Sequence, residues 1–334
     1  MGALGQLLRA DQGLTRWWDR QAPQDAWPTG VRLPEAGQLP GRLLDLTVPH
    51  EDINPLLAAC ALTAGEPVAG RLVERCAARL VREIGTVGRP APEPPPLPPL
   101  PPGLAAFGRW FPVLVHLTAL PHTRAYHRQR GIPVEVSRHT LADLGRTMAL
   151  HRRRHGTGGL LHPHWFAHHV RGELYQLGRL QFERTRLGGR CGQSVAAAGL
   201  PYGPGTPSLA IHIPDHLGPL TPAACEDALA RARAFFPRHF PEQPLTVATC
   251  HSWLLDPQLR GYLPAGANLL RFQDRFHPCY EQTEPDDTAP LVYVFGTPDP
   301  PLDALPASTT LERALVDHLR AGGHWYGGNG WLEL

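Results

Sequence analysis

The segment SLAIHIPDHLGPLTPAACEDALARARAFF, residues 208–236, decides the fold of the C-terminal half of the chain. Apolar and other side chains alternate over residues 208–214, which predicts a β-strand. A short loop over residues 215–220 follows, and the apolar spacing over residues 221–236 predicts a helix. LTVATC, residues 245–250, then predicts a second, buried strand. Strands that alternate with helices favour a mixed or mostly parallel sheet.

The first of these strands has two different faces. Leu209, Ile211 and Ile213 share one face, because alternate side chains of a strand point the same way. Ala210 and His212 lie on the other face. A histidine in this position is either a core residue bonded to a neighbour or a base beside a substrate. The sequence leaves both interpretations open.

The helix start after this strand predicts an anion site. Thr221 is a favoured N-cap residue, and Pro222 suits the first helical position. Free N–H groups and the helix dipole would face a ligand above the loop 215–220. The loop holds only one glycine, Gly218, and Pro219 and Pro222 each lack an N–H. The expected buried stripe of the helix is Cys225, Ala228, Leu229, Ala232 and Phe236.

Further strands are predicted on both sides of this unit. RLQFERTRL, residues 179–187, alternates with Leu180 and Phe182 on one face. LVYVFG, residues 291–296, is a continuous apolar run typical of a buried strand. The glycine-rich tail HWYGGNGWLEL, residues 324–334, is compatible with a final strand.

Two more helices are expected in this half. DPQLRGYL, residues 256–263, resembles a helix start. TTLERALVDHLRAGG, residues 309–323, combines a capping box of Thr309 and Glu312 with Gly322 as a C-terminal stop. Its expected buried stripe is Leu311, Leu315 and Leu319.

The N-terminal half has a helical pattern. RLVERCAARLVREI, residues 71–84, carries apolar residues at helical spacing. RPAPEPPPLPPLPPG, residues 89–103, can only be extended polyproline, as a linker or a surface insertion. The fold class expected is therefore α+β or α/β, with a helical domain over residues 1–155 and a mixed-sheet domain over residues 156–334.

Composition excludes several classes of function. The net charge of +2 argues against bulk nucleic-acid binding, and all 32 basic residues are arginine. No basic segment followed by a long apolar run opens the chain, and no apolar stretch approaches the length of a membrane span. The six cysteines form no CxxC pair, so neither a zinc ribbon nor a disulfide framework is expected. We therefore expect a reduced, cytoplasmic protein that does not bind membranes.

Four chemically distinct side chains stand in a row at the end of the second strand: Cys250, His251, Ser252 and Trp253. They suggest either an ordinary strand end or the rim of an active site. Neighbours on a strand point to opposite faces, so Cys250 and His251 are not expected to meet. No GxSxG elbow occurs, and covalent catalysis by this cluster is not favoured.

Glu183 lies in the middle of a predicted strand, where a carboxylate must be paired, solvated or functional. Arginines on the same strand make a structural ion pair the favoured alternative to a catalytic base. His164 and His168 form an HxxxH pair, but the HExxH motif is absent and no third ligand is evident. No metal site is predicted.

The order of four phrases resembles a known family. These are GLLHPHWFAHHVRGELYQLGRLQFER, LAIHIPDHLGPL, ARAFFPRHFPEQ and CHSWLLDPQLRGYLPAGANLLRFQDRF. They are similar to a bacterial, often actinobacterial, family with an N-acyltransferase-type helical N-terminal domain and a C-terminal domain like the GNAT acyltransferases. The resemblance covers residues 40–300 and is strongest over residues 156–276.

The resemblance implies an acyl-CoA cosubstrate bound between two strands that separate. Pantetheine amides would pair with the backbone around Ile211 and Ile213. Pyrophosphate would lie on the loop and the first helical turn, at Asp215, Gly218, Leu220 and Thr221. The superfamily's Q/R-x-x-G-x-G/A loop is missing, however, and PDHLGPLTP stands in its place.

The same resemblance implies direct acyl transfer to the amine of a small molecule or peptide. Glu183 or His212 would be the base, His251 or Ser252 would orient the acyl group or acceptor, and Tyr262 would protonate the leaving thiolate. One alternative is a GNAT-like module that binds a metabolite or protein without catalysis. A weaker alternative is a histidine-metal hydrolase.

Overall fold

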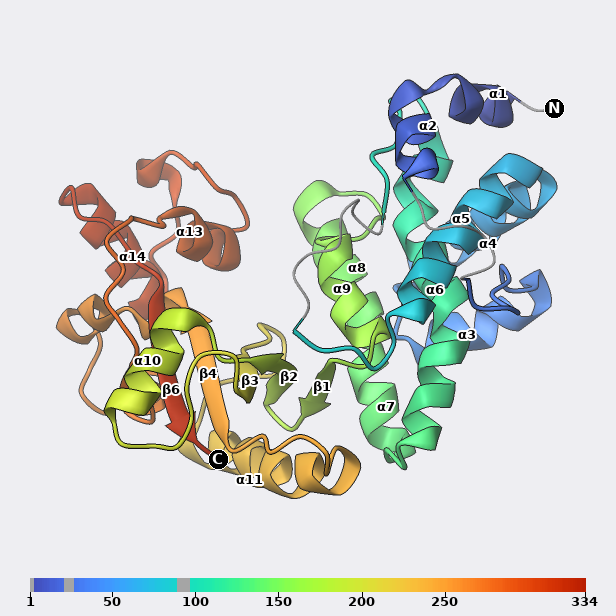
Figure 1. The fold of residues 1–334 in the computed structure, drawn as a ribbon. Coiled ribbons are helices and arrows are strands. Elements are labelled where there is room, and N and C mark those ends of the chain that lie inside the picture. The colour runs from blue at the N-terminus through green and yellow to red at the C-terminus, as the bar shows by residue number, and fades with distance from the viewer. Residues whose placement is uncertain (1–2, 21–26, 89–96) are drawn as a thin grey trace. The chain divides into compact units, whose positions relative to one another are not determined.

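The computed structural model describes residues 3–20, 27–88 and 97–334 (Figure 1). The chain divides after Tyr175 into two compact units. The expected division after residue 155 lies earlier than the observed one. Helix α9 accounts for the difference, because it packs against α5 and α6 of the first unit. In that contact the Nε2 atom of His116 lies 2.9 Å from the carbonyl oxygen of Pro163.

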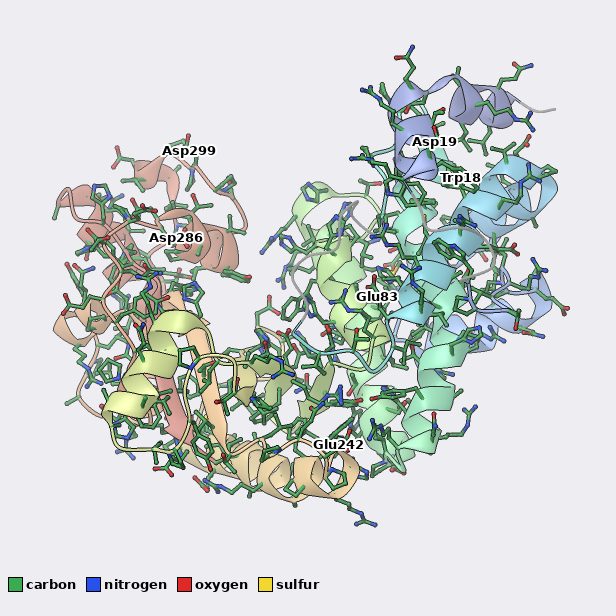
Figure 2. The ribbon with its side chains drawn as sticks, viewed as in Figure 1. Trp18, Asp19, Glu83, Glu242, Asp286 and Asp299 are labelled. Atoms are coloured by element: carbon green, nitrogen blue, oxygen red, sulfur yellow. A yellow bond between two sulfur atoms is a disulfide. The ribbon has the colours of Figure 1, made fainter. Side chains whose placement is uncertain are left out.

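The first unit is helical, as predicted. Its helices are α1 (Ala3–Ala10), α2 (Gln12–Asp19), the 3-10 helix η2 (Ala36–Gln38), α3 (Leu39–Asp45), α4 (His50–Gly65), α5 (Pro67–Arg82), α6 (Ala105–Gln129), α7 (Val134–Leu141), α8 (Asp143–His155) and α9 (Pro163–Val170). Helices α5 and α6 pack together at its centre. Figure 2 labels Glu83 just after α5, and its carboxylate lies 3.5 Å from Arg171 after α9.

The apolar stripe expected over residues 71–84 consists of Leu72, Val73, Cys76, Leu80 and Ile84. The first four are at most 1% exposed, whereas Ile84 follows the end of α5 and is half-buried. In the described part of the chain no single helix has the length and apolarity to cross a membrane. Only α4 and α5 taken together, bent by 108°, pass that test.

The proline-rich segment is only partly described. Residues 89–96 lie outside the described residues. Leu97 is buried, and Leu100 packs against the core of the helical unit. The C-terminal end of this segment is therefore part of the first unit.

The second unit is built on a mixed six-stranded sheet, which confirms the predicted fold class. The strand order is β1-β2-β3-β4-β6-β5, and only β3 and β4 are parallel among the pairs with a known register. The elements are β1 (Leu174–Leu177), β2 (Leu180–Arg186), α10 (Gly189–Ala197), β3 (Pro207–His212), α11 (Pro222–His239), β4 (Val247–Ser252), η3 (Trp253–Leu255), η4 (Pro257–Gly261), α12 (Asn268–Gln273), β5 (His277–Pro278), α13 (Thr288–Phe295), η5 (Leu302–Ala304), α14 (Thr310–Arg320) and β6 (Gly328–Glu333).

Strands β3 and β4 pair over a very short length. Their register joins only Leu209 with Ala248 and Ala210 with Thr249. By contrast, β4 pairs with β6 along its whole length, from Val247 to Ser252. The two parallel strands therefore part after Ala210, which leaves the β4-facing backbone of the following β3 residues outside the ladder.

Helix α11 covers one face of the sheet. Phe236 of α11 lies edge-on to Phe182 of β2, with ring centroids 6.3 Å apart. The guanidinium carbon of Arg184 lies 3.9 Å from the ring centroid of Phe240, after α11. Glu183 alternates with these residues and so lies on the opposite face of the sheet.

Two predictions of local structure were wrong. LVYVFG, expected as a strand, lies in helix α13, which begins at Thr288 and ends before Gly296 in the left-handed conformation. Only one side of this run is buried, and Tyr293 is 57% exposed. The segment that begins at Asp256 forms the single 3-10 helix η4, with Asp256 as its N-cap, instead of an α-helix. The capping box of α14 and the final strand were predicted correctly.

A disulfide joins Cys191 of α10 to Cys279 after β5, which corrects the expectation of a chain without disulfides. The two residues are 88 positions apart. No spacing pattern could have paired them, because the sheet brings α10 and the β5 edge together. The other four cysteines are free and buried.

Candidate active site

Glu183 and His212 form a hydrogen-bonded pair on the face of the sheet opposite α11. Glu183 is in register with Ala210, and His212 follows two residues later on β3, so the two side chains share a face. Glu183 Oε2 lies 2.8 Å from His212 Nε2. Both side chains are partly buried, with 15% and 28% exposed. Two of the predicted site residues are thus brought together.

The arginines of β2 have other positions. Arg184 packs on the opposite face of the sheet. Arg186 donates to the carbonyl oxygen of Gly205 at 2.8 Å. The sequence favoured an ion pair between Glu183 and an arginine. In the structure, the partner of Glu183 on its face of the sheet is instead His212.

His251 has a partner that fixes its tautomer. It is in register with Asn329 of β6, and His251 Nδ1 lies 2.7 Å from Asn329 Oδ1. The amide nitrogen of Asn329 donates to the carbonyl oxygen of Gly327, so its oxygen faces the imidazole. A carboxamide oxygen only accepts, and therefore Nδ1 of His251 carries the proton. In the neutral ring the lone pair is then on Nε2.

The surroundings of Asn329 hold this pair in place. Asn329 is 9% exposed, and its backbone carbonyl oxygen accepts a hydrogen bond from the N–H of Cys279 at 2.8 Å. A Cβ atom at Gly327 would lie 2.8 Å from Cε1 of His251. A side chain at this position would therefore push the imidazole out of its present place.

His212 and His251 point to the same side of the sheet. The pair Ala210–Thr249 aligns β3 with β4, and each histidine follows two residues after its member of the pair. The two imidazoles thus extend from strands that have already begun to part.

Cys250 and Ser252 have structural surroundings. Cys250 points to the face opposite His251, and burial raises the pKa of its thiol to about 12. It is therefore a neutral thiol near pH 7, and nucleophilic catalysis by it is not supported. The hydroxyl of Ser252 accepts the N–H of Leu254 at 3.1 Å and caps η3. Trp253 is buried in a small core with Trp325.

Tyr262 lies at the end of η4. Its hydroxyl is 2.8 Å from Nδ1 of His318 on α14, and the residue is 39% exposed. The ring also contacts Trp325, with centroids 5.9 Å apart. It belongs to a cluster with α14 and not to the strand residues described above.

The six residues predicted for cofactor binding follow one another along the chain. Ile211 is buried on the face of the sheet that α11 covers, and Ile213 is half-buried just after the end of β3. Asp215 is exposed and lies 3.2 Å from His216. Gly218 has a positive φ of 77°. Leu220 is buried, and the hydroxyl of Thr221 caps α11 by accepting the N–H of Ala224.

His164 of the HxxxH pair is exposed, and the two histidines that follow it on α9 lie beside different carboxylates. Nδ1 of His168 lies 2.8 Å from Glu173, and Nε2 of His169 lies 3.3 Å from Asp143. His169 is fully buried and stacks on Phe166. These residues stabilise the helical unit around α9.

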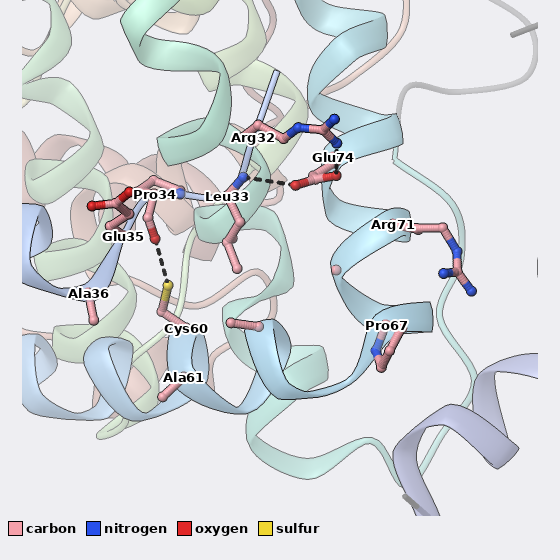
Figure 3. A pocket seen from close by; sticks show the side chains of 12 residues that line it. Arg32, Leu33, Pro34, Glu35, Ala36, Cys60, Ala61, Pro67, Arg71 and Glu74 are labelled. Atoms are coloured by element: carbon pink, nitrogen blue, oxygen red, sulfur yellow. Dashed lines mark hydrogen bonds and ion pairs between the residues drawn. The ribbon is translucent and has the colours of Figure 1, made fainter. Parts of the chain in front are cut away.

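A cavity of about 510 Å³ lies within the helical unit, between α4, α5 and the segment before α3 (Figure 3). On one side of the cavity, the carboxylate of Glu74 accepts hydrogen bonds from the guanidinium of Arg32 and the N–H of Leu33. Cys60 donates to the carbonyl oxygen of Pro34 on the other side. These bonds attach the segment to the helices, and the predicted catalytic residues lie in the other unit.

Sequence reasoning missed Asn329, Gly327 and the contact of Arg179 with the loop before α11. The only available signal was the glycine-rich tail, where an asparagine stands between glycines. Arg179 lies in the turn between β1 and β2, and its Nε donates to the carbonyl oxygen of Gly218 at 2.8 Å.

Comparison with known proteins places the chain in the class of GNAT-like acyltransferases. Residues 174–332 match the family GNAT-like C-terminal domain, and residues 37–172 match the family N-acyltransferase N-terminal domain. The chain belongs to this two-domain N-acyltransferase family. Curated proteins give no match.

Solved acyltransferase structures are similar to the whole chain. One, in complex with decanoyl-CoA, is 37% identical with a TM-score of 0.85, and the alignment covers 99% of this chain and 98% of that chain. Another, in complex with decanoyl-CoA and teicoplanin, is 38% identical with a TM-score of 0.83 and covers 99% and 97%. A third, with CoA and 10C-teicoplanin, is 37% identical with a TM-score of 0.83 and the same coverage.

Proposed function

We propose that this protein transfers an acyl group from acyl-CoA directly to an amine of a small-molecule acceptor. The observation that carries the proposal is the separation of β3 from β4 after Ala210 and Thr249, with Glu183, His212 and His251 on the adjoining strands. Backbone groups freed from a ladder are suited to the amides of pantetheine. The solved relatives support a medium-chain donor such as decanoyl-CoA and an acceptor of the teicoplanin type.

The reaction needs a base for the amine. In our proposal the Glu183–His212 pair takes the proton as one unit while the amine attacks the thioester carbonyl. Glu183 accepts the Nε2–H of His212, which orients the ring and stabilises the imidazolium that forms. The C–S bond then breaks, and the thiolate leaves as CoA–SH with the equivalent of the proton that the amine gave to the pair, which returns the pair to its starting state as the amide is released.

His251 is the second imidazole of the proposed site. Asn329 keeps its Nε2 as the acceptor, so we assign it to orient the incoming amine. Ser252 and Tyr262 remain candidates for orientation and for thiolate protonation, although each already has the protein partner described above. Since CoA thioesters are cytoplasmic metabolites, we place the reaction in the cytoplasm of a bacterium.

The test is steady-state kinetics with decanoyl-CoA and teicoplanin, with Glu183→Gln and His212→Asn as variants. We expect kcat to fall roughly 100- to 10,000-fold in each, with little change in the KM of the donor. Glu281→Gln and His139→Asn change exposed residues of the same types and serve as controls. Turnover like that of the wild type in both site variants would remove the pair from the mechanism.

Calorimetry with CoA separates this proposal from a non-catalytic module. Binding of CoA without turnover on any amine would favour the module.

A further inference from the structure

The start of α11 offers few donors to a phosphate group. Pro222 occupies the first helical position and has no N–H. The N–H of Ala224 is bound by the Thr221 side chain at 3.2 Å, and that of Cys225 by the Thr221 carbonyl oxygen at 3.0 Å. A helix start normally binds anions through such groups. A diphosphate at this position therefore needs another source of donors and positive charge.

Arg179 reaches this place from the turn between β1 and β2. Gly178 permits the turn with a φ of 64°, and a Cβ there would lie 3.0 Å from Asp227 of α11. The turn thus lies directly against the first part of the helix. Arg179 Nε then donates to the Gly218 carbonyl oxygen in the loop before α11.

The guanidinium of Arg179 is incompletely satisfied. The residue is 9% exposed, and its Nη1 is buried without a hydrogen-bond partner. Burial lowers the pKa of this guanidinium, and the nearby carboxylate of Asp215 opposes that shift. An unpaired buried donor costs about 1–3 kcal/mol, more if charged, so an anionic ligand at this point would remove a penalty present in the free protein.

Other charges near the helix start are already paired. Arg275 donates to the Pro222 carbonyl oxygen at 3.2 Å, and its Nη1 lies 2.9 Å from Glu226. Asp215, the nearest carboxylate in the loop, is exposed and lies beside His216. Arg275 is therefore neutralised by Glu226, whereas no ion pair of Arg179 is found among the described residues.

We propose that Arg179 is the phosphate ligand that replaces the missing Q/R-x-x-G-x-G/A loop, and that it binds the diphosphate of the CoA donor. This inference rests on the proposed function of the same site. A guanidinium forms short, charge-assisted bonds to phosphate oxygens, and its planar donors suit adjacent oxygens. Arg179, from the turn between β1 and β2, would thus supply the phosphate contacts that backbone N–H groups of the loop supply in other GNAT-like proteins.

The experiment compares two donors with the same acyl group. Decanoyl-CoA carries the phosphates, and the decanoyl thioester of N-acetylcysteamine does not. With Arg179→Met we expect KM for decanoyl-CoA to rise roughly 10- to 100-fold, while kcat/KM for the short thioester stays unchanged. Arg179→Lys should recover part of the loss. Arg231→Met is the matched control, since Arg231 is an exposed arginine of α11 paired with Asp227.

Three results would overturn the inference. They are an unchanged KM for decanoyl-CoA in Arg179→Met, an equal loss with both donors, and a loss in Arg231→Met as large as in Arg179→Met. The thermal midpoint of each variant shows whether it is folded, and if Arg179→Met is not, Arg179→Lys with the same two donors decides.

The failure of the proposed function is a separate result. If the wild type turns over neither donor, calorimetry with CoA and with pantetheine still tests Arg179. The inference is supported if Arg179→Met binds CoA more weakly than the wild type does but binds pantetheine equally well. Any other pattern, including no binding of CoA by the wild type, rejects it.

Discussion

Two buried histidines should make the helical unit sensitive to acid. His116 and His127 of α6 are at most 1% exposed, and desolvation lowers the pKa of each from 6.5 to about 4. Nδ1 of His116 and Nε2 of His127 are buried without hydrogen-bond partners. Protonation would therefore create a buried charge that nothing accepts.

The sign and size of the effect follow from linkage. The pKa is lower in the folded state, so the unfolded chain binds the proton more tightly between pH 4 and pH 6.5. Stability is fully present above pH 6.5 and falls as the pH drops toward 4. At pH 5 the loss relative to pH 7.5 is about 2 kcal/mol per histidine, or about 4 kcal/mol for both His116 and His127.

The assay is urea unfolding of the full chain at pH 7.5 and pH 5, followed by far-UV circular dichroism. His116→Gln keeps a donor at the position of Nε2, which faces Pro163, and His127→Asn keeps one at the position of Nδ1, which faces Ser137. Each amide lacks a group that titrates between these two pH values. The double variant should lose about 4 kcal/mol less than the wild type on acidification.

The exposed His139 provides the control, because His139→Gln should leave the pH dependence unchanged. Since two units can unfold in separate transitions, the comparison uses the transition that dominates the helical signal. An acid loss in the double variant equal to that of the wild type would refute the reasoning.

Three further predictions concern stability. Replacing Cys191 and Cys279 by serine should lower the free energy of unfolding by roughly 2–5 kcal/mol, whereas a reductant should then have no further effect on the thermal midpoint. Thr309→Ala removes the side-chain cap of α14 and should cost about 1 kcal/mol in urea unfolding, a loss that serine at this position should avoid. Gly145→Ala would normally favour a helix by about 1 kcal/mol, but here the new Cβ meets the Thr47 backbone, so we expect a net loss of roughly 1–3 kcal/mol and a lower thermal midpoint.

Local patterns predicted the parts of the sheet domain where one physical signal dominates. The strand with Leu209 and Ile211, the Thr221 cap and the capping box at Thr309 each depend on neighbours close in the chain. The run around Tyr293 was predicted wrongly because a short apolar stretch has no period of its own. Its C-terminal Gly296, a common helix stop, was the signal against a strand.

The site was predicted only as far as single strands allow. Alternation placed His212 and Glu183 on particular faces, but their contact depends on the register of β2 with β3. Asn329 reaches His251 only because the last strand of the chain pairs with β4, 78 residues away. Such partners are set by tertiary pairing, which one sequence does not reveal.

The bond between Cys191 and Cys279 turns the chain between them into a covalent ring that contains β3, α11 and β4. A protease that cuts one peptide bond inside this ring would open it without releasing a fragment. On a gel the nicked protein would then keep its full mass without reductant and fall into two pieces with it.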